Sequence, residues 1–115
     1  MAKIATSIEQ GKALLKLGID RSSADMYWWY AEGKNYLYVG TPKDDNAVPA
    51  WSLDELMYQL PQQIYDEEGS ILPLNIIPFG GKWRICYDDI LYARDKNIIE
   101  AVVTTLCKLH EERKL

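Results

Sequence analysis

The stretch DMYWWYAEGKNYLYVG, residues 25–40, places six aromatic rings in two short runs on either side of a turn-like segment. In an extended chain, neighbouring side chains point to opposite faces, so both faces of these runs are aromatic. Gly33-Lys34 fits a two-residue hairpin loop with glycine at the first central position, as a type II′ turn prefers. The sequence therefore predicts a β-hairpin that turns at Gly33-Lys34.

Pairing outward from that turn sets Trp29 opposite Tyr38 and Trp28 opposite Val39, and it separates two faces. The drier face is predicted to point to the core and holds Met26, Trp28, Tyr30, Leu37 and Val39. The other face also carries Ala31, but rings with polar tips dominate it, which suits a half-wet surface. We call its four rings the outer aromatic face: Tyr27, Trp29, Tyr36 and Tyr38.

The first helix is predicted at about residues 7–17. Thr6 and Glu9 have the spacing of a capping box, in which each side chain satisfies a backbone N–H at the helix start. Gly11 would allow another segment to approach closely, and Gly18 would end the helix in a left-handed conformation.

Two further helices follow from similar signals. The segment WSLDELMYQLP predicts a short helix that Ser52 caps together with Glu55, and Pro61 cannot continue it. Asn97 is predicted to cap a closing helix at about residues 98–112. Residues 41–50, TPKDDNAVPA, are predicted to form a loop because prolines, aspartates and an asparagine dominate them.

A second hairpin is predicted around Gly80-Gly81, between ILPLNIIPF and KWRICY. This turn sets Ile76 opposite Ile85 and Leu74 opposite Tyr87, which makes one face apolar on both strands. A one-residue slip would destroy that agreement, so the pattern favours this register. The segment ILYA after Asp88-Asp89 could add another short strand.

These elements predict an α+β fold in one domain, residues 1–115. An antiparallel sheet of four or five strands, built from the two hairpins, would form one layer, and the N-terminal, central short and C-terminal helices would pack on it. A chain of 115 residues can bury about two-thirds of the surface that its unfolded form exposes, which is enough for one core.

Composition narrows the classes of partner. The net charge of −4 and the scattered lysines and arginines argue against a surface that binds nucleic acid. No apolar stretch approaches the length of a membrane span, and early lysines interrupt any signal-like run. The expected compartment is the cytoplasm, where Cys86 and Cys107 would stay reduced.

Several segments together resemble a family of small uncharacterised proteins encoded by gut Bacteroides and by their phages and mobile elements. They are EQGKALLKLGID, SADM, PAWSLDELMYQLP and the closing LCKLHEE. These motifs are structural in character, consisting of caps and helix faces. The resemblance implies a cytoplasmic protein that a mobile element could carry, and it transfers no catalytic residue.

No catalytic constellation emerges from the residues. Cys107 and His110 would share one helix face, but a packed cysteine and a histidine near a helix C-terminus explain both positions. One histidine and two separated cysteines cannot build a closed zinc site, and the acidic pairs fall at predicted turns. We therefore expect a protein that is not an enzyme and that needs no metal or cofactor.

Three functional hypotheses remain. The first is a protein-interaction module that binds an unknown protein partner, or a second copy of itself as a homodimer, through the outer aromatic face. The second is a small-ligand-binding protein with a cleft lined by Trp51, Tyr58 and Trp83. The third is an inhibitor or immunity-type protein of a mobile element, whose acidity would mask a basic target.

Overall fold

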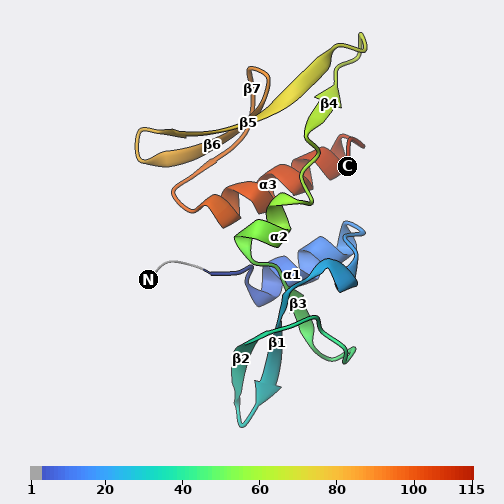
Figure 1. Ribbon diagram of the computed structural model, residues 1–115, viewed down its shortest axis with the longest axis vertical. Helices are drawn as coiled ribbons and strands as arrows, with labels where there is room; N and C mark the ends of the chain where they lie inside the picture. Colours follow the sequence, from blue (N-terminus) through green and yellow to red (C-terminus); the bar gives the residue numbers. More distant parts are fainter. Residues whose placement is uncertain (1–3) are drawn as a thin grey trace. The chain divides into compact units, whose positions relative to one another are not determined.

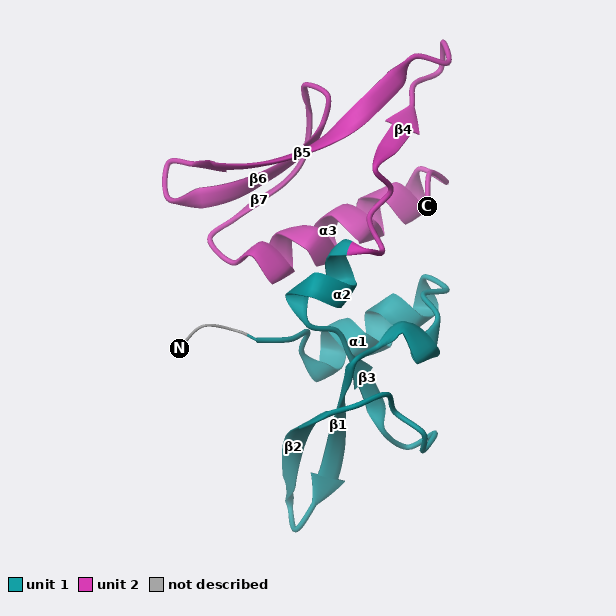
Figure 2. Cartoon of the chain, in the orientation of Figure 1, with its two compact units in different colours: residues 1–57 teal, residues 58–115 magenta. Residues whose placement is uncertain are grey.

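A computed structural model describes residues 4–115 of the chain, which divides after Met57 into two compact units (Figure 2). Figure 1 shows the order of their elements. Unit 1 contains α1 (Ile8–Lys16), the 3₁₀ turn η1 (Arg21–Ser23), β1 (Met26–Ala31), β2 (Lys34–Val39), β3 (Val48–Ala50) and α2 (Leu53–Met57). Unit 2 contains β4 (Gln63–Tyr65), β5 (Ile71–Phe79), β6 (Lys82–Tyr87), β7 (Ile90–Asp95) and α3 (Ile98–Glu111).

The α+β class with antiparallel hairpins is confirmed, and the strands are divided between two sheets. Unit 1 holds a three-stranded sheet of order β2-β1-β3, and unit 2 holds a four-stranded sheet of order β4-β5-β6-β7. The expectation of a single domain stays a prediction. Among residues 4–115, no helix combines the length and the apolar character needed to cross a membrane.

The first hairpin forms, but its predicted register was wrong by two residues. The turn lies at Glu32-Gly33, both with positive φ, and it sets Trp29 opposite Tyr36 and Trp28 opposite Leu37. Positive φ at both central residues is the type I′ pattern, which matches the twist of the strands better than most turns do. Because side chains alternate with a period of two, this shift leaves the composition of each face unchanged.

The start of α1 also differs from the prediction. Ser7, not Thr6, is the N-cap, and its partner in the capping box is Gln10 rather than Glu9. Thr6 is instead buried, and its hydroxyl accepts a hydrogen bond from the backbone N–H of Trp51 at 3.1 Å. The predicted bounds of about residues 7–17 thus lie close to the observed helix, Ile8–Lys16. Gly18 takes the left-handed conformation expected after α1.

The predicted 41–50 loop contains the missed strand β3. It pairs antiparallel with the first half of β1, so that Pro49 lies opposite Tyr27. Pro49 is tolerated because β3 is an edge strand, where a missing N–H breaks no central ladder. Helix α1 lies directly against this strand, since a Cβ atom added at Gly11 would stand 2.3 Å from the carbonyl oxygen of Pro49. The close approach predicted for Gly11 is thus confirmed.

Ser52 precedes α2 as predicted, but Asp25 supplies its main contacts. The Asp25 carboxylate accepts from the Ser52 N–H at 2.9 Å and from the Ser52 hydroxyl at 2.6 Å. The Ser52 hydroxyl in turn lies 3.5 Å from the N–H of Glu55. A carboxylate from the segment before β1 therefore takes the place predicted for the Glu55 side chain in the capping box.

Unit 2 follows the prediction closely except for β4, a short strand that the sequence analysis did not predict. The β5–β6 hairpin turns at Gly80-Gly81 with Ile76 opposite Ile85 and Leu74 opposite Tyr87. The segment after Asp88-Asp89 forms β7, with a register shift beside Ile85. Helix α3 is capped by the Asn97 side chain, as predicted, and lies along one face of the sheet (Figure 1).

The core of unit 2 lies between α3 and that face. Ile85 and Tyr87 of β6 are fully buried, as are Val102, Leu106 and Leu109 of α3. The Tyr87 ring meets the ring of Tyr92 edge-on, and the Tyr87 hydroxyl donates to the carbonyl of Pro61 at 2.7 Å. The Tyr92 hydroxyl donates to the Glu112 carboxylate at 2.5 Å, so both buried tyrosine hydroxyls have a hydrogen-bond partner, as burial requires.

Candidate interaction surface

The outer aromatic face assembles as the alternation predicted. Tyr27 and Trp29 of β1 and Tyr36 and Tyr38 of β2 project to the same side, with Tyr27 opposite Tyr38 and Trp29 opposite Tyr36. The rings of Tyr27 and Tyr38 stack with centroids 5.5 Å apart and an interplanar angle of 20°. Tyr36 and Tyr38 keep 41% and 42% of their surface exposed, while Tyr27 and Trp29 are half-buried. Four partly exposed rings therefore share one surface.

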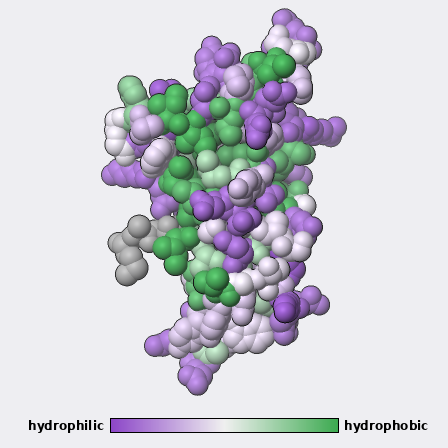
Figure 3. Space-filling model, viewed as in Figure 1, coloured by the Kyte–Doolittle hydropathy of each residue, from purple (hydrophilic) through white to green (hydrophobic). Residues whose placement is uncertain are grey.

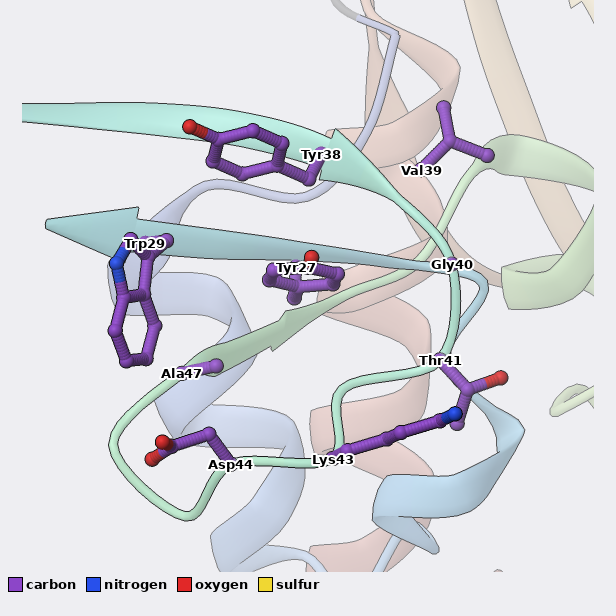
Figure 4. A pocket seen from close by; sticks show the side chains of 9 residues that line it. All are labelled: Tyr27, Trp29, Tyr38, Val39, Gly40, Thr41, Lys43, Asp44 and Ala47. Atoms are coloured by element: carbon purple, nitrogen blue, oxygen red, sulfur yellow. The ribbon is translucent and has the colours of Figure 1, made fainter. Parts of the chain in front are cut away.

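The loop between β2 and β3 borders these rings and creates a hollow of about 690 Å³. In Figure 4 the Trp29 ring stands beside β1 and reaches toward Ala47 and Asp44 of the loop, and Tyr27 lies at the centre. Its lining residues are Tyr27, Trp29, Tyr38, Val39, Gly40, Thr41, Lys43, Asp44 and Ala47. The loop thus forms one wall of the hollow and leaves the rings accessible.

Hydrogen bonds from η1 hold that wall in place. The guanidinium of Arg21 donates to the carbonyl oxygens of both Asp44 and Ala47. Within the loop, the N–H of Ala47 donates to the Asp44 carbonyl at 3.0 Å, and the N–H of Asn46 donates to the Asp44 carboxylate at 2.8 Å. Because these contacts fix both ends of residues 44–47, the hollow exists before any ligand arrives.

The hollow combines opposite charges with aromatic surface. Lys43 and Asp44 both line it, and in Figure 4 the Lys43 amine extends toward Thr41, away from the Asp44 carboxylate. The indole N–H of Trp29 and the tyrosine hydroxyls add donors at the edges of the rings. This arrangement can bury apolar groups against the rings and satisfy a few polar groups at its rim, but it places no nucleophile beside a base.

The opposite face of the same hairpin is only partly the core face that the sequence predicted. Trp28 is held there, because its indole N–H donates to the carbonyl of Thr6 at 3.0 Å. Tyr30 and Val39, by contrast, are 66% and 84% exposed, so the prediction that they face the core was wrong. Strand β3 pairs only with Met26–Trp28, and the hairpin beyond it extends past the packed part of unit 1.

The three residues predicted to line the alternative cleft lie in different units, and one of them, Trp51, offers no surface to a ligand. Trp51 is fully buried inside unit 1, where its indole N–H donates to the hydroxyl of Ser23 at 2.9 Å, so it cannot offer a face to a ligand. Tyr58 is 80% exposed and Trp83 is half-buried on β6, and both belong to unit 2.

The cysteines lie where the sequence placed them, Cys86 in β6 and Cys107 in α3, and both are free thiols. Burial, with a smaller contribution from Glu111, raises the pKa of the Cys107 thiol. A nucleophilic cysteine needs the opposite shift, because the thiolate is the reactive form. Among residues 4–115, no group of three or more His, Cys, Asp or Glu side chains is placed to hold a metal ion.

Sequence reasoning missed the contribution of Arg21, Lys43 and Asp44 to this surface. Residues 41–50 read as a loop, and nothing in their order shows that Arg21 would fix them beside the rings. The chain matches no family model, no curated protein and no solved structure. The resemblance to the Bacteroides proteins therefore stays a prediction.

Proposed function

We propose that the chain is a protein-interaction module that binds its partner through the outer aromatic face. The observation that carries this proposal is the set of four partly exposed rings on one face of the β1–β2 hairpin. Tyrosine and tryptophan contribute much of the binding energy at protein interfaces, because they bury a large area at a small cost in side-chain entropy.

Preorganisation supports the same proposal. The strand ladder and the Tyr27–Tyr38 stack fix the rings, and Arg21 fixes the neighbouring loop. A surface that is ordered before binding loses little conformational entropy when a partner docks, so more of the contact energy contributes to affinity. Such order would be of little use to a surface that only faced water.

The shape of the surface favours a protein over a small molecule. Tyr36 lies outside the hollow, next to Trp29 on the neighbouring strand, and extends the aromatic area along the hairpin. A small ligand would cover the hollow and leave this ring in water. A polypeptide can cover the hollow and Tyr36 together.

The proposal is tested by removing two rings from the outer aromatic face and one ring from the opposite face of the hairpin. We expect the Trp29→Ala/Tyr38→Ala variant to lose self-association in native mass spectrometry, or to lose a partner that the wild type captures. The matched control, Tyr30→Ala, removes an exposed ring from the opposite face of β1 and should leave binding unchanged. A wild type that stays monomeric at high concentration and captures no partner would overturn the proposal, as would equal losses in both variants.

The volume of the hollow also suits a small planar ligand, and about 690 Å³ lies within the usual range for ligand sites. A thermal-shift screen against metabolites separates this second candidate from the first. A ligand that binds only the folded chain raises the melting temperature. Such a rise, lost in Trp29→Ala but with no partner protein found, would favour the small ligand.

A further inference from the structure

The four-stranded sheet of unit 2 has a second face, which points away from α3. Alternation along β5, β6 and β7 places it on the side opposite Ile85 and Tyr87. We call the following residues the basic sheet face: Ile77, Phe79, Lys82, Arg84, Leu91 and Arg94. Figure 3 shows hydrophobic and hydrophilic residues interleaved over the part of the molecule that unit 2 occupies.

Positive charge is concentrated on this face without a counter-charge. Arg84 lies directly opposite Arg94, and like charges in such pairs repel each other. The three strands contain one acidic residue, Asp95, and it lies opposite Trp83 on the other face. Neither guanidinium forms an ion pair with any residue from 4 to 115.

Arg84 shows most directly that an acceptor is missing. Its Nε–H is buried and has no hydrogen-bond partner among the described residues. Its guanidinium lies over the Phe79 ring, with the carbon atom 5.4 Å from the ring centroid, which holds the group in one orientation. The covered Nε–H is out of reach of an outside acceptor, but the terminal amino groups of the same guanidinium are not buried and have no partner among the described residues, so they can donate to a bound carboxylate.

Exposed apolar side chains surround the arginines. On β5, Ile77 lies opposite Arg84 and is 49% exposed, and Phe79 is 64% exposed. On β7, Leu91 is 44% exposed. The face therefore offers paired guanidinium groups, which favour bidentate carboxylates, within apolar surface. Phosphate chains would leave Ile77 and Leu91 uncovered, and three cations are few for a nucleic-acid surface.

From this combination we infer that the basic sheet face binds an acidic polypeptide segment. Carboxylates of the segment accept from Arg84 and Arg94, and its apolar side chains cover Ile77, Phe79 and Leu91. This second surface lies in unit 2, so it does not depend on the outer aromatic face of unit 1. The two surfaces would give the chain two binding sites of different chemistry.

The test uses a random copolymer of glutamate and tyrosine as the probe, followed by NMR of the ¹⁵N-labelled full chain. We expect saturable shifts at the backbone amides of Ile77 and Leu91 and at the Arg84 Nε–H, and weaker binding as salt rises. Polyglutamate, which lacks apolar side chains, should bind roughly tenfold more weakly. A lysine–tyrosine copolymer should not bind this face.

Two variants separate recognition from loss of fold. Arg84→Gln/Arg94→Gln should weaken copolymer binding by roughly tenfold or more. Arg94→Gln alone changes an exposed side chain, so it keeps the test valid if the double variant unfolds. The control Arg113→Gln/Lys114→Gln removes two charges beyond α3 and should change affinity by less than about twofold.

Three results would overturn the inference. They are shifts that map to another surface, affinity that the arginine variants leave unchanged, and equal or tighter binding of a dT oligonucleotide. The last result would identify a phosphate-binding face instead. Failure of this test leaves the outer aromatic face unaffected, because its variants and readouts lie in the other unit.

Discussion

The two β-hairpins of this chain have the same topology, but only one of them has a face that is fully covered by a neighbouring element. Hairpin β5–β6 has one face covered by α3, with Ile85 and Tyr87 fully buried. Hairpin β1–β2 has rings on both faces and buries neither completely. The comparison shows that aromatic content alone does not make a core, because burial depends on which face a neighbouring element covers.

The largest expected contrast comes from deleting one side chain in each hairpin. Ile85→Ala should lower the free energy of unfolding by about 2–5 kcal/mol, because it leaves a cavity beneath α3. Tyr30→Ala, at an exposed position of β1, should change it by less than about 0.5 kcal/mol. Urea unfolding measures both variants. Equal effects would show that the first hairpin also forms part of a core.

The contact between α1 and β3 gives the next test, since it anchors the sheet of the first hairpin. Glycine to alanine inside a helix normally stabilises it, but at Gly11 the new methyl would overlap the Pro49 carbonyl. Gly11→Ala should therefore destabilise the chain by about 1–3 kcal/mol in thermal or urea unfolding. Lys12→Ala, at the next, exposed position, is the control. A stabilising Gly11→Ala would contradict this packing.

High pH should weaken the core beneath the second hairpin. Burial, with help from the hydrogen bond to Glu112, raises the pKa of Tyr92 from 10.0 to about 12. The unfolded phenol ionises near pH 10, so stability is fully present below that pH and is lost as pH rises through about 12. Unfolding measured between pH 9 and 12 should show this loss, and Tyr92→Phe should show a shallower one. Parallel curves for the two proteins would contradict the prediction.

The smallest expected effect concerns the turn of the first hairpin. Glu32 has a φ of 51°, which costs a non-glycine residue energy. Glu32→Asn, which creates the favoured Asn-Gly turn, should stabilise the chain by about 0.5–1 kcal/mol. Lys34→Asn should give no gain, because Lys34 lies in β2 opposite Ala31. The reverse result would support a turn at Gly33-Lys34.

The sequence predicted the two hairpins with different success for a physical reason. In β5–β6 the paired glycines Gly80-Gly81 mark the turn, and the single apolar face then excludes a one-residue slip. In β1–β2 a shift of two residues leaves both faces aromatic, and only the turn conformation distinguishes the alternatives. Trp29 and Tyr38 were still assigned to the correct face, because alternation determines the face on which a side chain lies but not the residue with which it pairs.

The rest of the candidate surface depends on contacts between distant residues. Strand β3 has three residues and contains a proline, and it forms because β1 offers an edge to pair with. Arg21 reaches the carbonyl oxygens of residues 44 and 47, which no local pattern encodes. Sequence patterns predict helix caps and strand faces, whereas tertiary contacts decide which loop borders which ring.

The link between the start of unit 1 and Trp51 has a consequence for synthesis of the chain. Thr6 and Trp51 exchange hydrogen bonds in both directions, and Ala5 forms a bridge with Ser52. On a ribosome, Thr6 therefore waits for 45 further residues before its partner Trp51 exists. The aromatic hairpin can form locally during that interval. The contacts of Ala5 and Thr6 should therefore be the last in unit 1 to form.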